Sequence, residues 1–272
     1  MNVRTTGCRI NLITLLAVCG GGVSGAVYAD ESCEALFLGV NRVDQTTSCG
    51  VVGASLIGYK STYTNGFELG VVPHISVIWE SLYIDNAEAG VLLWGDLSQQ
   101  SYSLLTTFVR LSENGYDASE EAQLRGLDDT NEVVEVGVRF SLGGEFGEVQ
   151  LAFAHDVSSK HKSYVAEASY VYEWDINGYQ MALSTGVEYL SKDAAQYFYG
   201  VSEDQVSSLR RLYKQDVALN FQAGYSVEKS VTEHWNVFHF ASYTLYDNDI
   251  KDSPLTVNDN GYSVGLGLSY TF

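Results

Sequence analysis

The sequence is poor in proline, in basic residues and in long apolar runs. It has 2 prolines in 272 residues, and its 15 Lys and Arg against 34 Asp and Glu give a net charge of −19. Proteins that bind nucleic acid neutralise phosphates with a basic surface, so this balance argues against a nucleic-acid partner. After the first 29 residues, no run approaches the roughly 18 apolar residues of a membrane-spanning helix. The 26 glycines and 19 tyrosines instead favour an all-β protein with many strands.

The first 29 residues have the three parts of a secretory signal peptide. Two arginines precede an apolar segment at 10–18, and a cleavage site of small residues ends at Ala29. We expect cleavage between Ala29 and Asp30, which leaves residues 30–272 as a single exported domain.

Two of the four cysteines, Cys33 and Cys49, remain in this mature chain. An exported protein with an even number of cysteines commonly pairs them, so we expect a disulfide between these two. If strands at 34–41 and 49–63 form a hairpin, both cysteines lie at similar distances from its turn and can face each other, as disulfide geometry requires.

Long segments of the mature chain alternate strictly between apolar and small or polar residues. In residues 262–272, Tyr, Val, Leu and Phe alternate with Ser, Gly and Thr, and the same period recurs in 134–142, 181–189 and 217–227. Period two is the pattern of a β-strand with one apolar face. Strands of soluble sandwiches usually have about five or six residues. A tilted strand that crosses a bilayer needs about ten, which is the length seen here.

Aromatic residues bracket several of these segments. Tyr164 and Trp174 stand at the ends of one, and Tyr179 and Tyr189 at the ends of the next. Trp and Tyr collect at the headgroup level on both sides of a membrane. The sequence therefore predicts an all-β fold, a transmembrane, antiparallel, up-and-down β-barrel.

We expect about twelve strands in this barrel. They are 34–41, 49–63, 67–79, 81–94, 100–112, 131–142, 146–157, 163–174, 178–190, 213–227, 231–246 and 261–272. Ten strands are the alternative, because 34–41 barely alternates and Asp85-Asn86 suggests a bulge within 81–94. Long and short gaps alternate along the chain, which predicts long extracellular loops, short periplasmic turns and both termini in the periplasm.

Several motifs resemble the MipA/OmpV family of outer-membrane proteins. They are Leu124-Arg125-Gly126-Leu127 before an alternating strand, the loop segment Tyr197, Phe198, Tyr199, Gly200, Val201 and Ser202, then Asp252-Ser253-Pro254-Leu255, and the terminal aromatic. The resemblance covers about residues 51–272 and leaves 30–50 unmatched. It implies a monomeric barrel in the outer membrane of a Gram-negative bacterium. Its best-known member is described as a scaffold that joins a murein lytic transglycosylase to a murein synthase.

Charged side chains on the strands should point into the barrel lumen, because lipid cannot host them. On this basis we expect a polar network of Glu135, Arg139, Glu167 and Glu188, for example Arg139 with Glu135 or a neighbouring glutamate. If the lumen is open, its acidic excess predicts a preference for cations.

The C-terminal Tyr270 and Phe272 resemble the terminal aromatic signal by which the barrel-assembly machinery recognises its clients. That machinery is therefore an expected partner, together with outer-membrane lipid and lipopolysaccharide. The acidic loop 113–130 is expected either to bind cation-bridged lipopolysaccharide or simply to be solvated.

The sequence contains no motif of a serine hydrolase, metalloprotease or nucleotide-binding enzyme. Asp128, Asp129, His155 and Asp156 fall at expected rim positions, where a barrel protease would activate water. We interpret them as ordinary loop and strand ends. No enzymatic activity, cofactor or metal is therefore expected.

Three functions stay open at the level of sequence. The resemblance implies a scaffold tied to peptidoglycan synthesis and remodelling. The alternatives are a narrow cation-preferring channel or solute-specific pore, and a surface adhesin that acts through loops 113–130 and 191–212.

Overall fold

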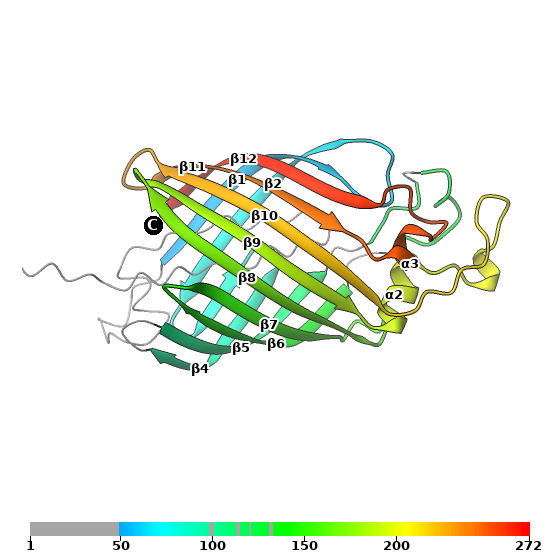
Figure 1. The fold of residues 1–272 in the computed structure, drawn as a ribbon, viewed down its shortest axis with the longest axis horizontal. Coiled ribbons are helices and arrows are strands. Elements are labelled where there is room, and N and C mark those ends of the chain that lie inside the picture. The colour runs from blue at the N-terminus through cyan, green and yellow to red at the C-terminus, as the bar shows by residue number, and fades with distance from the viewer. Residues whose placement is uncertain (1–48, 98–100, 113–114, 120, 131–132) are drawn as a thin grey trace, which may run out of the picture.

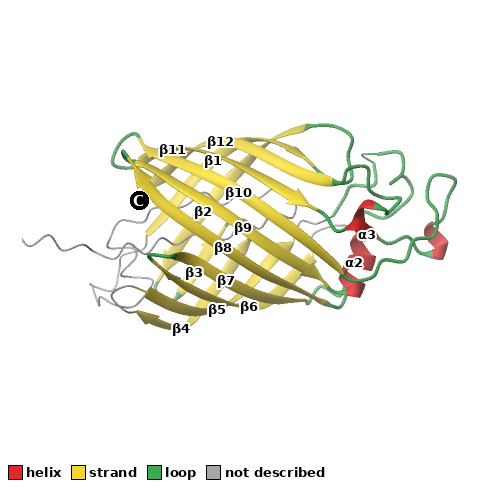
Figure 2. Cartoon of the chain, in the orientation of Figure 1, coloured by secondary structure: helices red, strands yellow, loops and turns green. Residues whose placement is uncertain are grey.

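The computed structural model describes residues 49–97, 101–112, 115–119, 121–130 and 133–272. They form one closed antiparallel barrel in which strands adjacent in sequence are hydrogen-bonded and β12 returns to β1 (Figure 1). The strands are β1 (Cys49–Lys60), β2 (Glu68–Trp79), β3 (Leu82–Asp85), β4 (Glu88–Leu97), β5 (Ser101–Ser112), β6 (Val133–Gly144), β7 (Gly147–Asp156), β8 (Tyr164–Ile176), β9 (Tyr179–Leu190), β10 (Ala218–Ser230), β11 (Trp235–Leu245) and β12 (Asn260–Thr271). The helices α2 (Lys192–Tyr199), η1 (Glu203–Gln205) and α3 (Asn248–Lys251) lie in the loops (Figure 2).

The alternation read from the sequence separates the outside of the barrel from the lumen. In β12, Val264, Leu266 and Leu268 are 47%, 60% and 53% exposed, whereas Ser263 and Ser269 are buried. Apolar side chains on the outer face suit lipid, and polar or small ones on the inner face suit a lumen. The predicted barrel class is confirmed.

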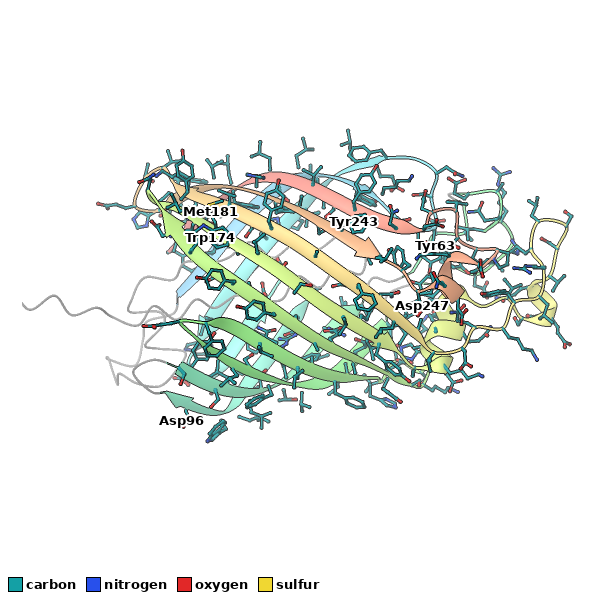
Figure 3. The ribbon with its side chains drawn as sticks, in the orientation of Figure 1. Tyr63, Asp96, Trp174, Met181, Tyr243 and Asp247 are labelled. Carbon is teal, nitrogen blue, oxygen red and sulfur yellow. The ribbon has the colours of Figure 1, made fainter. Side chains whose placement is uncertain are left out.

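The two ends of the barrel differ. Long loops and the helices α2, η1 and α3 gather at one end, the loop end, and tight turns and the C-terminus at the other, the turn end (Figure 1). All four tryptophans, Trp79, Trp94, Trp174 and Trp235, lie in the halves of their strands nearest the turn end. Figure 3 shows Trp174 and Asp96 at this end, opposite Tyr63 and Asp247 at the loop end. The tryptophans thus form an aromatic belt on one side only.

The number of strands is as predicted, but their identity is not. The expected strand 34–41 lies outside the described residues, and both edges of β1 are paired, with β12 and β2. The expected strand 81–94 is instead two strands, β3 and β4. The chain reverses between them at Asn86, whose φ of 49° is left-handed and suits asparagine in a tight turn.

Inside the barrel, aromatic rings lie over glycines of the neighbouring strand. Phe240 and Phe238 on β11 cover Gly265 and Gly267 on β12, their direct cross-strand partners. An added Cβ at either glycine would overlap the ring. The same arrangement joins Phe108 to Gly137, Tyr102 to Gly143 and Tyr83 to Gly90. These rings fill the lumen close to its wall.

Candidate functional site

Arg110 on β5 joins two glutamates inside the lumen. Its Nε donates to Glu135 at 2.7 Å, and its Nη1 and Nη2 donate to the two oxygens of Glu167 at 3.1 and 2.6 Å. The Arg110 side chain is 10% exposed and that of Glu135 is 1% exposed. One arginine therefore neutralises two glutamates that stand on β6 and β8.

A second ion pair lies beside the first. Arg139 on β6 forms a two-pronged contact with Glu88 on β4, at 2.5 and 2.7 Å, and Tyr83 donates to the same carboxylate at 2.6 Å. The Phe108 ring lies near both guanidinium groups, at 5.4 Å from Arg110 and 4.7 Å from Arg139. Cation–π contact and bidentate pairing both hold arginine in a fixed geometry.

The four residues expected to form one lumen network belong to three groups. Glu135 and Glu167 meet through Arg110, and Arg139 binds Glu88. Glu188, the cross-strand partner of Glu167 on β9, accepts from Asn220 at 2.9 Å. Sequence reasoning missed Arg110 and Glu88. Both stand an even number of residues from other inward residues of their strands. Since lipid excludes charged side chains, the sequence alone could have assigned both to the lumen.

The loops fold over the mouth of the barrel and form a packed cap. Inward residues at the strand tops pack with apolar residues of the loops and helices. This cluster contains Tyr63, Tyr116, Leu124, Val133, Val165, Leu190, Ala194, Ala195, Phe198, Tyr199, Val201, Ala218, Ile250 and Leu255. The cap therefore has its own hydrophobic core, which covers the lumen at the loop end (Figure 1).

Hydrogen bonds tie the loops of the cap to one another. The Tyr63 hydroxyl donates to the Phe198 carbonyl at 3.1 Å, and the Ser253 hydroxyl donates to the Tyr199 carbonyl at 2.6 Å. Arg210 donates to the carbonyls of Gln123 and Arg125 in a loop more than eighty residues away, at 2.6 and 2.8 Å. Separate loops thus form one body.

The loop segment 197–202, one of the motifs that resemble the MipA/OmpV family, lies at the centre of this cap. Phe198, Tyr199 and Val201 are almost fully buried, and Val201 pairs with Tyr213 in a short antiparallel bridge. Gly200 lies against Gln196, whose side-chain oxygen accepts from the Gln215 backbone at 2.8 Å, and a Cβ at position 200 would overlap that side chain. The motif therefore serves packing of the cap.

The candidate residues for an enzyme do not form a catalytic group. His155 points outward from β7 and binds the backbone oxygen of Asp156 at 2.9 Å. The Asp156 carboxylate accepts from the backbone of Ser158, His161 and Lys162, and so holds the following loop. Among the described residues, no group of three or more His, Cys, Asp or Glu could hold a metal ion.

At the turn end, the last residues close the barrel. Phe272 and Gly50 exchange backbone hydrogen bonds at 3.0 and 3.2 Å, and the half-exposed Phe272 ring lies over Gly50. Tyr270 stacks edge-on against Trp235 at 5.2 Å. Cys33, Ala29 and Asp30 lie outside the described residues, so the disulfide and the cleavage site stay predictions.

A closed twelve-stranded barrel with an apolar outer face and a polar lumen is the architecture of an outer-membrane β-barrel protein. No helix among the described residues is long and apolar enough to cross a bilayer. The model of the family described as "MltA-interacting protein MipA" matches residues 52–272, and the chain belongs to this family.

Curated relatives agree with this assignment. The chain is 23% identical over 236 residues to the "MltA-interacting protein" of Escherichia coli K12, a match that covers 86% of this chain and 93% of the relative. It is 24% identical over 168 residues to "Outer membrane protein Omp26La" of Vibrio anguillarum, covering 62% of this chain and 65% of that protein. It is also 24% identical to "Putative outer membrane protein YiaT" of E. coli K12, over 89% of this chain and 99% of the relative. The chain is thus a Gram-negative outer-membrane protein.

Solved structures with a similar arrangement include an anion-selective porin from Comamonas acidovorans. It has a TM-score of 0.41 and 5% identity, and the match covers 83% of this chain and 99% of the porin. OmpT of Vibrio cholerae has the same TM-score, with 8% identity over 83% of this chain and 97% of its own.

Proposed function

We propose that this barrel is a non-enzymatic interaction protein that anchors part of the murein machinery, a lytic transglycosylase with a murein synthase, at the periplasmic rim. The name of the E. coli relative, "MltA-interacting protein", supports this class of partner. The observation that carries the proposal is the charge of the rim. Glu80, Asp96, Glu145, Asp175 and Glu233 are all exposed at the turn end.

Basic groups are scarce at this rim. Among the described residues there, Lys229 is the one Lys or Arg, and its Nζ is already engaged. It donates to the carbonyls of Asn177 and Gly178 at 3.2 and 3.1 Å and lies 4.4 Å from the centre of the Tyr179 ring. A surface with this charge attracts a basic protein and orients its approach.

The size of the rim also matters for binding. Specific interfaces bury about 800 Å² on each partner, which a single tight turn cannot supply. The acidic residues stand on five turns or strand ends distributed round the barrel, so a partner that covers several of them meets a larger surface.

The lumen supports an interaction role over the alternative of an open cation channel. Its arginines are paired with glutamates along the wall, and the packed cap covers the loop end. The cap also counts against the adhesin alternative in its simplest form, because its loops pack on one another instead of extending freely from the barrel.

Photo-crosslinking in cells tests the proposal. Probes at Asn177 and Glu80 should give adducts that contain a murein hydrolase or synthase, whereas a probe at Gln205 in the cap should not. Reversing two rim charges, Glu80→Lys with Glu233→Lys, should remove the adducts of the Asn177 probe.

The matched control reverses two exposed acids at the opposite end, Glu203→Lys with Asp204→Lys, and should leave the adducts intact. Rim probes that capture no murein enzyme, or adducts that survive the rim reversal, would refute the proposal.

A further inference from the structure

The barrel wall has a gap between β2 and β5, on the half nearest the loop end. β3 has only 4 residues, and it pairs with β2 only from Ser76 to Trp79. β4 pairs with β5 up to Glu88 opposite Arg110. Above the turn that joins β3 to β4, no strand of the described residues therefore lies between β2 and β5.

The turn at the lower border of this gap is pinned on both sides. Asn86 donates its backbone N–H to the Ile75 carbonyl at 2.7 Å, and its side-chain oxygen accepts from Ile75 N–H at 3.1 Å. On the other side, Leu111 N–H donates to the Ala87 carbonyl at 3.0 Å. The short hairpin is thus held in place between the two long strands.

The upper half of β2 is a free edge. The backbone N–H and C=O of Ile75 both point toward the β3–β4 turn. In an antiparallel strand, every second residue directs its N–H and C=O to the same edge. The backbone groups of Leu69, Val71 and residue 73 therefore point into the gap. No backbone–backbone bond joins that side of these three residues to another described residue. Residue 73 is Pro73, which lacks an N–H. Proline in a sheet is confined to such edges, so the sequence encodes the free edge.

The lipid side of the gap is aliphatic. Val71 and Leu69 are 72% and 71% exposed, more than any other large apolar residue among those described. At the lower border of the gap, Ile84 of the hairpin and Leu111 of β5 are also exposed. Side chains of paired strands are partly covered by their neighbours, and here the neighbouring strand is missing.

The lumen side of the gap is acidic and has room. Glu68 accepts hydrogen bonds from the Tyr59 hydroxyl at 2.6 Å and from Thr64 at 2.9 Å, and Asp85 stands at the hairpin tip. At Gly70, an added Cβ would meet only the Ile57 methyl at 3.7 Å, in contrast to the glycines that are covered by rings. No ring of a described residue therefore covers the inner face of the free edge at Gly70.

The cap closes the gap from above and makes it a window. Asn65, in the loop before β2, donates to both carboxylate oxygens of Glu121, at 2.7 and 3.3 Å. Gln123 donates to the Tyr63 carbonyl at 3.0 Å. Because the cap covers the mouth, this β2–β5 window joins the lumen to the lipid of the outer leaflet.

We propose that the β2–β5 window admits an aliphatic amine, a molecule with a hydrocarbon tail and a protonated amino group. The tail lies against Leu69 and Val71, and the ammonium group passes inward to Glu68. The carboxylates repel fatty acids and other anionic amphiphiles, so charge sets the selectivity. This binding site is independent of the proposed anchoring of murein enzymes.

Photolabelling of the full chain in lipid vesicles tests the window. The probe is dodecylamine with a diazirine in its chain, and dodecanoic acid with the same group is the charge control. Adducts of the amine should concentrate on residues 69–75, 84 and 111, and the acid should label them several times less. Equal labelling by both probes, or even labelling round the barrel, would overturn the proposal.

Two matched pairs of variants separate binding from general effects on folding. Leu69→Asn should lower labelling by the amine, whereas Leu266→Asn, the same change on a fully paired lipid-facing strand, should not. Glu68→Gln should weaken the preference for amine over acid, whereas Glu188→Gln on the far wall should leave it unchanged. All four should keep the heat-modifiable migration of a folded barrel.

The rival occupant of the free edge is the chain's own N-terminal segment. A benzoylphenylalanine at position 71 should crosslink lipid or the amine. Crosslinks from position 71 to residues 30–48 would overturn the proposal, because that segment would then fill the window.

Discussion

Replacing Arg110 with methionine should destabilise the barrel strongly, because one side chain neutralises two buried glutamates. Its three donors lie 2.6 to 3.1 Å from Glu135 and Glu167, whose side chains are 1% and 13% exposed. Removing one partner of a buried ion pair costs about 3–5 kcal/mol, much of it from the uncompensated charge that is left. We therefore expect Arg110→Met to lower the free energy of unfolding by about that amount.

The reasoning also predicts a rescue. Replacing a whole buried ion group with neutral residues is often close to neutral for stability. The triple variant Arg110→Met, Glu135→Gln, Glu167→Gln should therefore recover most of the loss, to within about 1–2 kcal/mol of the parent. Arg125→Met, at an exposed arginine in the cap, is the control and should change stability by less than about 0.5 kcal/mol.

The assay is reversible urea unfolding in phospholipid vesicles, followed by fluorescence of the four tryptophans. A loss below about 1 kcal/mol for Arg110→Met would show that the glutamates are solvated or protonated without it. A triple variant no more stable than the single one would show that geometry, and not uncompensated charge, sets the cost.

Further outcomes follow from the cap, the C-terminus and the cysteines. Phe198→Ala should cost the cap about 3–5 kcal/mol and expose its loops to protease in intact cells, while the barrel stays folded. Burial lowers the pKa of His161 in the cap, so the folded cap favours the neutral ring. The cap should then be most stable above about pH 6.5, the pKa of an unfolded histidine, and should lose this stability as the pH falls toward the lowered pKa of His161. His161→Gln should remove this dependence of proteolysis on pH. Phe272→Ala should reduce the amount of assembled barrel without affecting export. Peptide mapping without reductant should find Cys33 joined to Cys49, and two free thiols would contradict that pairing.

The barrel class could be predicted from the sequence because lipid imposes its own requirement. Every outward residue of a strand such as β12 must be apolar, whichever strand lies beside it. The alternating pattern can therefore be recognised in the sequence before the pairing of the strands is known. The loop end and the turn end could be predicted from the alternation of long and short gaps between strands.

The hairpin of β3 and β4 was hidden by its own geometry. Inward residues are odd-numbered in β3, at Tyr83 and Asp85, and even-numbered in the first part of β4, from Glu88 to Leu92. A bulge within one long strand changes the phase in the same way as a two-residue turn. Only the pairing of β3 with both β2 and β4 distinguishes the two.

The charged groups of the lumen were partly predictable. The alternation along each strand indicates that Glu135, Arg139, Glu167 and Glu188 point inward. It does not indicate which of the charged side chains form ion pairs. Arg139 binds Glu88, 51 residues away on a strand two positions round the barrel. Such partners depend on strand register, which no local pattern in one sequence contains.

The rings over glycines also determine how β11 and β12 can align. The smallest slip that keeps side chains facing the lumen is two residues. A slip in one direction sets Phe238 opposite Ser269, and a slip in the other sets Phe240 opposite Ser263. Either serine places a Cβ and a hydroxyl where the ring must lie. Two inward glycines flanked by two serines on the final strand thus reject a misaligned closure while the barrel is being assembled.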